Sequence, residues 1–243
     1  MKKFDYLTPE VLASMIDHTF LKAAGDANAV KKLCREAKEY RFACAMVNPC
    51  EVATAVKALK GSDVRVGTVI GFPLGQNSEA VKRLEAVDAI TTGADIVDYV
   101  INVRALKAAA AEIARNCKRM LVSTQLAADL AEFVEAVKSV APEVETKIII
   151  ETCYLTDAEK VVACLMAKDA GFDFVKTSTG FGSSGATVED VKLMRKTVGR
   201  KMGVKAAGGI RDLDSALALI DAGANRLGCS ASVDIVEAFS KRI

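Results

Sequence analysis

A recurring glycine pattern constrains the fold of this chain more than any other feature of the sequence. A helical segment ends in Gly, one residue follows, and Asp or Asn then leads into an apolar run, as in TTGADIVDYVI (91–101), DAGFDFVKT (169–177) and DAGANRLG (221–228). Glycine just past a helix end adopts the left-handed conformation that other residues resist. Short apolar runs after such turns are typical of strands buried on both faces. The pattern therefore predicts repeated helix–turn–strand units in a parallel sheet.

Eight segments fit as strands of such a sheet. Their starts lie 23 to 31 residues apart, one strand and one helix each, except for a 51-residue gap between the fourth and the fifth. This repetition predicts the α/β class and a (β/α)8 TIM barrel that forms a single domain over residues 1–243. A doubly wound open sheet is the competing fold. The predicted strands are Ile16–Leu21, Ala43–Asn48, Val66–Phe72, Val97–Asn102, Ile148–Thr152, Phe174–Thr177, Gly203–Ala207 and Arg226–Cys229.

The long gap between the fourth and fifth predicted strands contains two segments with helical character, Arg104–Lys118 and Ala127–Val140. Between them, Met120–Gln125 is ambiguous and is compatible with an extra strand. An insertion of this length predicts that the region 103–146 departs from the simple alternation of strand and helix.

Charge and residue usage exclude several classes of function. The chain has 33 Lys+Arg against 31 Asp+Glu and no dense basic tract, which argues against nucleic acid or a membrane as partner. The one histidine, His18, excludes His-rich metal sites within one chain. Scattered cysteines without CxxC, and the absence of a signal region or a long apolar run, predict a cytoplasmic location.

Three charged residues lie inside predicted strands, where burial is costly unless the charge is paired. They are Lys176 in DFVKTSTG, Lys205 in MGVKAAGG and Asp98 in DIVDYVIN. Each one alone is compatible with a paired structural charge at a strand end. Together on three strands of one barrel, two lysines and a carboxylate can depress the pKa of one lysine. A neutral lysine amine attacks carbonyl groups and forms a Schiff base.

Glycine-rich segments follow the last three predicted strands. Gly208 and Gly209 follow the seventh strand, Gly228–Ala231 follow the eighth, and Thr179 and Gly180 follow the sixth. A tight turn is the alternative explanation for a glycine pair. In a barrel, however, the loops after strands seven and eight form the usual phosphate site with a helix N-terminus. The sequence therefore predicts a small phosphorylated ligand.

His18 lies in the first predicted strand, IDHTFL. Side chains alternate along a strand, so Asp17 and Thr19 share one face and His18 lies on the other. If Asp17 faces the barrel interior, His18 points toward the helices. We expect it to be structural.

The motifs on these strands resemble those of the deoxyribose-phosphate aldolases, a family of class I aldolases. The matching segments cover all eight predicted strands: IDHTFLK (16–22), VNP (47–49), GTVIGFPLG (67–75), GADIVDYVIN (93–102), KIIIETCYL (147–155), DFVKTSTGF (173–181), VKAAGGIR (204–211) and RLGCS (226–230). The resemblance implies reversible cleavage of 2-deoxy-D-ribose 5-phosphate to glyceraldehyde 3-phosphate and acetaldehyde. It also implies a dimer or tetramer, and phosphosugar and aldehyde substrates. It implies no metal and no other cofactor, which agrees with the single histidine.

The resemblance assigns a role to each matching position. Lys176 is the Schiff-base lysine, Lys205 keeps it neutral, and Asp98 moves protons through a water molecule. The resemblance places Asp17, Thr19 and Thr179 at the substrate, and it assigns phosphate binding to Gly180, Gly208, Gly209 and Ser230.

Two positions depart from the family pattern: Met46 stands where cysteine is frequent, and Ala231 replaces a second serine. We expect Ala231 to weaken one phosphate contact, and neither Met46 nor the nearby Cys44 to be catalytic. Three other functions are compatible with the residues. They are a Schiff-base aldolase for another phosphosugar, a phosphate-binding isomerase or synthase without covalent chemistry, and a binding barrel without activity.

Overall fold

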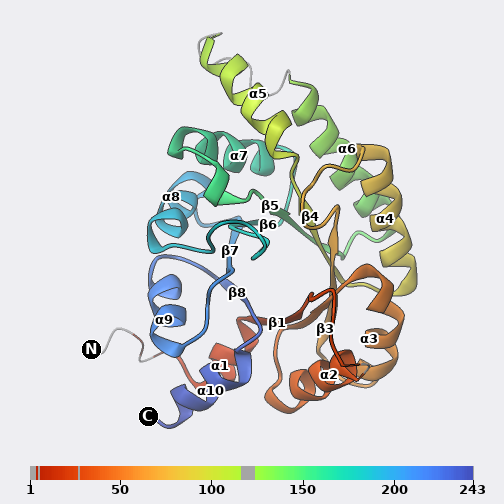
Figure 1. Cartoon of the computed structure of the whole chain (residues 1–243), viewed down its shortest axis with the longest axis vertical. Helices are drawn as coiled ribbons and strands as arrows, with labels where there is room; N and C mark the ends of the chain where they lie inside the picture. Colours follow the sequence, from red (N-terminus) through yellow and green to blue (C-terminus); the bar gives the residue numbers. More distant parts are fainter. Residues whose placement is uncertain (1–3, 5, 27, 116–123, 243) are drawn as a thin grey trace.

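Eight parallel strands close into a barrel surrounded by helices (Figure 1). The computed structural model describes residues 4, 6–26, 28–115 and 124–242. Each strand pairs with the next along the chain, and β8 pairs with β1. The predicted (β/α)8 barrel is therefore confirmed, and a closed sheet excludes the open doubly wound alternative.

The strands are β1 (Ile16–Phe20), β2 (Cys44–Val47), β3 (Arg65–Ile70), β4 (Ile96–Val100), β5 (Glu145–Ile149), β6 (Phe174–Lys176), β7 (Gly203–Ala207) and β8 (Arg226–Cys229). The helices are α1 (Pro9–Ser14), α2 (Ala29–Tyr40), α3 (Val52–Leu59), α4 (Glu79–Thr92), α5 (Val103–Arg115), α6 (Gln125–Val140), α7 (Asp157–Asp169), α8 (Val188–Val198), α9 (Leu213–Asp221) and α10 (Ser232–Ser240), with short 3₁₀ helices η1 (Pro49–Glu51) and η2 (Thr152–Tyr154).

The recurring glycine pattern ties neighbouring strands together at the start of the barrel. Gly93, Gly171 and Gly223 have φ values of 111°, 88° and 114°, in the left-handed region. Two residues after each glycine, a side-chain oxygen accepts a hydrogen bond from a backbone N–H of the preceding strand. The pairs are Asp95 with Val66 (2.8 Å), Asp173 with Thr146 (2.8 Å) and Asn225 with Val204 (2.9 Å). The repeat therefore pairs β3 with β4, β5 with β6 and β7 with β8.

The predicted strand boundaries are correct at β7 and β8 and within one or two residues at β1, β2, β3, β4 and β6. The fifth strand is wrong by three residues, since it covers Glu145–Ile149 and not Ile148–Thr152. The reason is chemical: Glu145 and Lys147 have the charge of loop residues, yet both side chains lie in the barrel, and Lys147 is fully buried. Because of this shift, the predicted strand leaves out the buried Lys147.

The barrel interior is divided into an apolar and a polar part. Leu21, Cys44, Met46, Val69 and Ile96 form a buried apolar cluster on the side of β1 to β4. Met46 and Cys44 are fully buried within it, so both contribute to packing. The charged residues occupy the remaining interior. The main apolar core lies between the strands and the surrounding helices.

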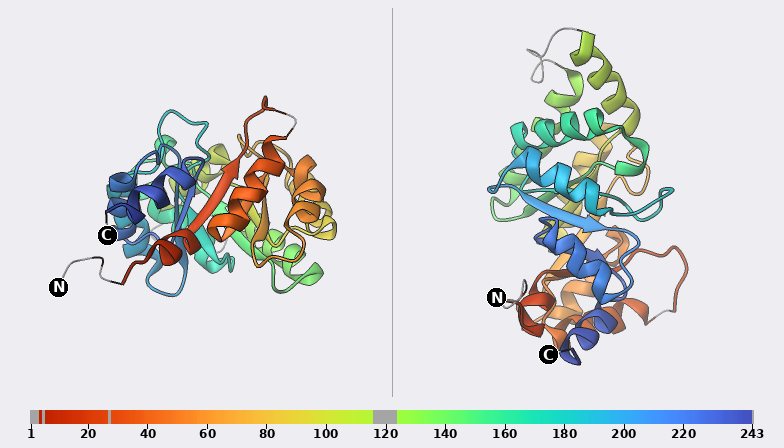
Figure 2. Two further views of the ribbon diagram at one scale, coloured as in Figure 1. Left: turned by 90° about the horizontal axis from the view of Figure 1, so that it is seen from below. Right: turned by 90° about the vertical axis from the view of Figure 1, so that its left-hand side faces the viewer.

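The long gap before β5 contains α5 and α6, which project from the ring at the top of Figure 1 and of the right-hand view in Figure 2. The two predicted helices are thus confirmed as far as residue 115 and from residue 125 onward. Of the ambiguous segment Met120–Gln125, residues 120–123 lie outside the described part. Thr124 caps α6 and Gln125 is its first helical residue, so neither belongs to an extra strand.

Candidate active site

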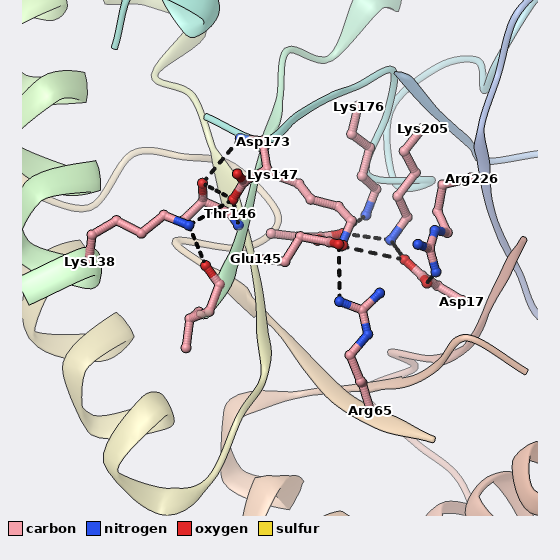
Figure 3. Close-up of polar contacts among 12 residues, drawn as sticks. Asp17, Arg65, Lys138, Glu145, Thr146, Lys147, Asp173, Lys176, Lys205 and Arg226 are labelled. Carbon is pink, nitrogen blue, oxygen red and sulfur yellow. Dashed lines mark hydrogen bonds and ion pairs between the residues drawn. The ribbon is translucent and has the colours of Figure 1, made fainter. Parts of the chain in front are cut away.

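The two lysines and the carboxylate predicted from the sequence meet inside the barrel. Lys176 ends β6, Lys205 lies on β7 directly opposite it in the strand register, and Asp98 lies on β4. Oδ2 of Asp98 is 2.8 Å from Nζ of Lys176 and 2.8 Å from Nζ of Lys205. All three side chains are buried. One carboxylate oxygen is therefore shared by two amines, which the close-up shows converging from neighbouring strands (Figure 3).

Asp17 is the second buried carboxylate of this cluster. Its Oδ2 accepts a hydrogen bond of 2.5 Å from Lys205, and its Oδ1 lies 3.3 Å from Nη1 of Arg226 on β8. Burial opposes ionisation of Asp17, but Lys205 and further cations outweigh it and lower its pKa to about 2. The pKa of Asp98 is lowered as well, because the attraction of Lys176 and Lys205 outweighs burial. Both carboxylates are ionised at neutral pH.

The two lysines differ in pKa because their neighbours differ. Burial lowers the pKa of Lys176 and the repulsion of Lys205 adds to this, so that the pKa is about 8 despite the attraction of Asp98. Burial acts on Lys205 too, but two carboxylates, Asp17 and Asp98, raise its pKa above the usual lysine range. Lys205 is thus the ammonium and Lys176 the amine that loses its proton first, as a carbonyl nucleophile requires.

Of the residues predicted to bind the substrate or its phosphate, all but Asp17 line one cavity of about 430 Å³ at the mouth of the barrel, whereas Asp17 is fully buried and does not line it. Its lining includes Thr19, Lys176, Thr179, Gly180, Gly208, Gly209 and Ser230. Gly180, Gly208 and Gly209 have φ values of 86°, 87° and 77°, in the left-handed region. A Cβ at Gly185 would lie 2.0 Å from the carbonyl oxygen of Gly208. The backbones at Gly185 and Gly208 thus lie so close together that a side chain at position 185 would not fit, which leaves backbone groups to contact a ligand.

The sequence profile described as DeoC/LacD family aldolase matches residues 11–235. The chain belongs to this aldolase family. Curated relatives named deoxyribose-phosphate aldolase occur in Bacteroides thetaiotaomicron, 53% identical over 235 residues (97% of this chain, 93% of the relative), and in Caldanaerobacter subterraneus subsp. tengcongensis, 50% identical over 231 residues (95% and 94%). The solved deoxyribose phosphate aldolase of Aeropyrum pernix matches with a TM-score of 0.82 at 31% identity, covering 97% of this chain and 94% of that chain. The resemblance seen in the motifs is confirmed.

Among the described residues of this DeoC/LacD family aldolase, a third lysine is buried in the barrel interior, and the motifs did not predict it. Lys147 on β5 is fully buried, and its Nζ lies 3.8 Å from Oδ1 of Asp98 and 3.9 Å from Oδ2 of Asp17. It also forms an ion pair with Glu145, two residues earlier on the same face of the strand. The alternation of side chains along β5 predicts that Lys147 faces the barrel interior, but only when the strand begins at Glu145, three residues earlier than predicted.

A buried glutamate also escaped the sequence analysis. Glu151 follows β5, is 4% exposed and has a φ of 55°, in the left-handed region that favours glycine. Its carboxylate accepts hydrogen bonds from the backbone N–H of Thr179 (3.3 Å) and from the Thr179 hydroxyl (2.5 Å). The Thr179 oxygen in turn accepts from the N–H of Phe181 (3.0 Å). Glu151 therefore fixes the loop that carries Thr179 and Gly180.

The prediction that His18 is structural and points away from the barrel interior agrees with its contacts. Its Nδ1 is 2.9 Å from Oγ of Ser232 on α10, and its Nε2 is 3.0 Å from Glu36 on α2. Among the described residues, no group of three His, Cys, Asp or Glu side chains could hold a metal ion. None of the described helices is both long and apolar enough to cross a membrane.

Proposed function

We propose that this chain is a class I deoxyribose-phosphate aldolase that cleaves 2-deoxy-D-ribose 5-phosphate reversibly to glyceraldehyde 3-phosphate and acetaldehyde. The names of relatives about half identical to it support the substrate. The observation that carries the chemistry is that the buried Lys176 and Lys205 share one Asp98 oxygen, at 2.8 Å from each amine. Burial and the repulsion of Lys205 lower the pKa of Lys176 to about 8, although Asp98 opposes this shift. Such an amine is suited to form a Schiff base.

The first half of the reaction builds an electron sink on Lys176. The amine attacks the C1 aldehyde of the open-chain sugar, a C–N bond forms, and the carbonyl oxygen takes up a proton. The nitrogen proton leaves by way of Asp98, which lies within hydrogen-bond distance of both amines. Loss of water from the carbinolamine gives a protonated imine. We propose that Lys205, held as an ammonium by Asp17 and Asp98, supplies the proton for the departing hydroxide.

The second half breaks the carbon–carbon bond. Removal of the proton from the C3 hydroxyl makes this oxygen a carbonyl, the C2–C3 electron pair moves to the imine, and glyceraldehyde 3-phosphate departs. The enamine that stays on Lys176 is protonated at C2 and hydrolysed, which releases acetaldehyde and restores the amine. Asp17 and Thr19 are proposed to contact the sugar, and Gly180, Gly208, Gly209 and Ser230 the phosphate. The cavity that most of them line supports this assignment.

Borohydride trapping tests the proposal directly. Reduction in the presence of deoxyribose 5-phosphate is expected to add a substrate-derived mass to one peptide, and mapping is expected to place it on Lys176. The same incubation without borohydride is expected to release acetaldehyde. Activity without any trapped adduct would support a phosphate-binding barrel without covalent chemistry. An adduct that forms only with another phosphosugar would show that this sugar, and not deoxyribose 5-phosphate, is the substrate.

Substitution of Glu151 by glutamine is expected to weaken binding of the phosphorylated substrate. The amide keeps the shape but removes the charge that holds Thr179, and hydrogen bonds to charged groups contribute about 1.5–3 kcal/mol. We expect KM for deoxyribose 5-phosphate to rise about 10-fold with a smaller change in kcat. Trapping with acetaldehyde, which has no phosphate, serves as the control and should proceed at the normal rate. An equal loss of both reactions would contradict a role confined to the phosphate loop.

The assembly and location are also proposals. The solved relative from Aeropyrum pernix is described as tetrameric, which supports a homo-oligomer, dimer or tetramer, for this chain. The cysteines in the described part of the chain are free of disulfides, which supports a reducing cytoplasm as its location. Nucleic acids and membranes are not among the proposed partners, in keeping with the balanced charge.

A further inference from the structure

Charged side chains continue below the reacting amine toward the opposite end of the barrel (Figure 3). At the N-terminal end, Nη1 of Arg65, the first residue of β3, is 3.0 Å from Oε2 of Glu145, the first residue of β5. Glu145 pairs with Lys147, and Lys147 reaches both Asp17 and Asp98. A chain of ion pairs thus joins the active-site carboxylates to the far side of the barrel.

Lys147 approaches Asp98 from a different side than the two other lysines. The register of β4 and β5 places Lys147 directly opposite Asp98, so the backbone fixes this neighbour. Lys176 and Lys205 both contact Oδ2, whereas Lys147 lies 3.8 Å from Oδ1. No described residue gives Oδ1 a hydrogen bond, so the Lys147 ammonium is the cation that faces this oxygen.

The charges of this network balance when Lys176 carries no proton. Apart from Lys176, its described members with side chains at most 16% exposed are three carboxylates and three cations: Asp17, Asp98 and Glu145, and Lys147, Lys205 and Arg226. Arg65, 34% exposed, is partly screened by water. Because an unpaired buried charge costs several kcal/mol, a proton on Lys176 is disfavoured. Without Lys147, that proton would restore the balance.

We propose that Lys147 is a positioning residue for the Schiff-base reaction, whose charge holds Asp17 and Asp98 from the side opposite the substrate and so makes Lys176 lose its proton more readily. This inference deepens the proposed function and depends on it. A purely structural lysine would affect folding but not the pH at which Lys176 reacts. The pH profile of the reaction therefore separates the two roles.

The test compares the rate of trapping by acetaldehyde and cyanoborohydride between about pH 6 and pH 10. The wild-type rate should rise with pH around the Lys176 pKa of about 8. In Lys147→Met, the midpoint is expected to move by about one unit to higher pH, because a nearby cation is lost. Trapping at pH 7 should fall about 10-fold and should recover in alkaline solution. Lys147→Arg, which keeps the charge, is expected to restore the midpoint.

Glu145→Gln provides a test of opposite sign. It removes a negative charge from the network, so the midpoint is expected to move to lower pH. Lys82→Met is the matched control, because Lys82 is equally buried but is bound outside the barrel interior by Glu79 (3.0 Å), Tyr99 (3.2 Å) and Val100 (3.1 Å). Its loss should lower the melting temperature and leave the midpoint unchanged.

The outcomes distinguish this inference from the proposed function. A wild-type protein that forms no adduct at any pH would overturn the proposed function and the inference together. Normal wild-type trapping with an unshifted midpoint in folded Lys147→Met would overturn the inference alone. If Lys147→Met does not fold, Glu145→Gln decides: a midpoint at lower pH supports the inference, and an unshifted one overturns it.

Discussion

Replacement of Lys176 by methionine is expected to abolish the trapped adduct and to lower kcat/KM for deoxyribose 5-phosphate by about 10⁴-fold or more, a loss of about 5.5 kcal/mol in transition-state stabilisation. Without the amine, neither the imine nor the enamine can form. Lys205 cannot replace it, because Asp17 and Asp98 hold it as an ammonium at 2.5 and 2.8 Å. Peptide mapping after borohydride reduction and a coupled assay of glyceraldehyde 3-phosphate are the measurements.

The same variant should be as stable as the wild type. The ion pairs around Asp98 keep Lys205 and Lys147 when Lys176 is removed, and methionine has a similar volume. A thermal melt should therefore show an unchanged or higher melting temperature. Residual activity above about 1% of the wild type in a folded Lys176→Met protein would refute the covalent mechanism.

The local sequence was sufficient to predict those strands in which a single charged residue is flanked by apolar or small residues. Lys176 and Lys205 are each flanked by apolar or small residues in β6 and β7, so the strand pattern stays visible around them. The glycine loops were equally visible, because a left-handed backbone strongly favours glycine. The closure of the barrel brings together the two lysines and the glycine-rich loops that the motifs predicted.

The two residues that escaped prediction depend on contacts across the barrel. Lys147 follows Glu145 in a charged run that has the composition of a loop, and its burial is tolerated because Asp17 and Asp98 approach from other strands and add to the charge of Glu145. Glu151 has a left-handed backbone that its own residue type does not favour. Its bonds to Thr179, on the loop after β6, stabilise this conformation. Neither contact is encoded in a local pattern.

Lys205→Met is expected to impair both stability and the reaction. The variant leaves Asp17 and Asp98 without their closest common cation, and the loss of one partner from a buried ion pair costs about 3–5 kcal/mol. Because the pKa of Lys205 is raised in the folded state, its contribution to stability is fully present below the ordinary lysine pKa of 10.5 and is lost only as the pH rises through the folded value. Chemical denaturation at neutral pH measures this loss.

The effect of Lys205→Met on the reaction follows from the same carboxylates. With the repulsion of Lys205 removed, Asp98 favours a protonated Lys176, so its pKa should rise above about 8. Activity at pH 7 should fall about 100-fold or more, and part of the trapping rate should return in alkaline solution. Lys205→Met should thus be both less stable and less active, whereas Lys176→Met should be inactive but stable. A Lys205→Met protein with normal stability and an unshifted pH profile would show that Lys205 does not control the charge of Lys176.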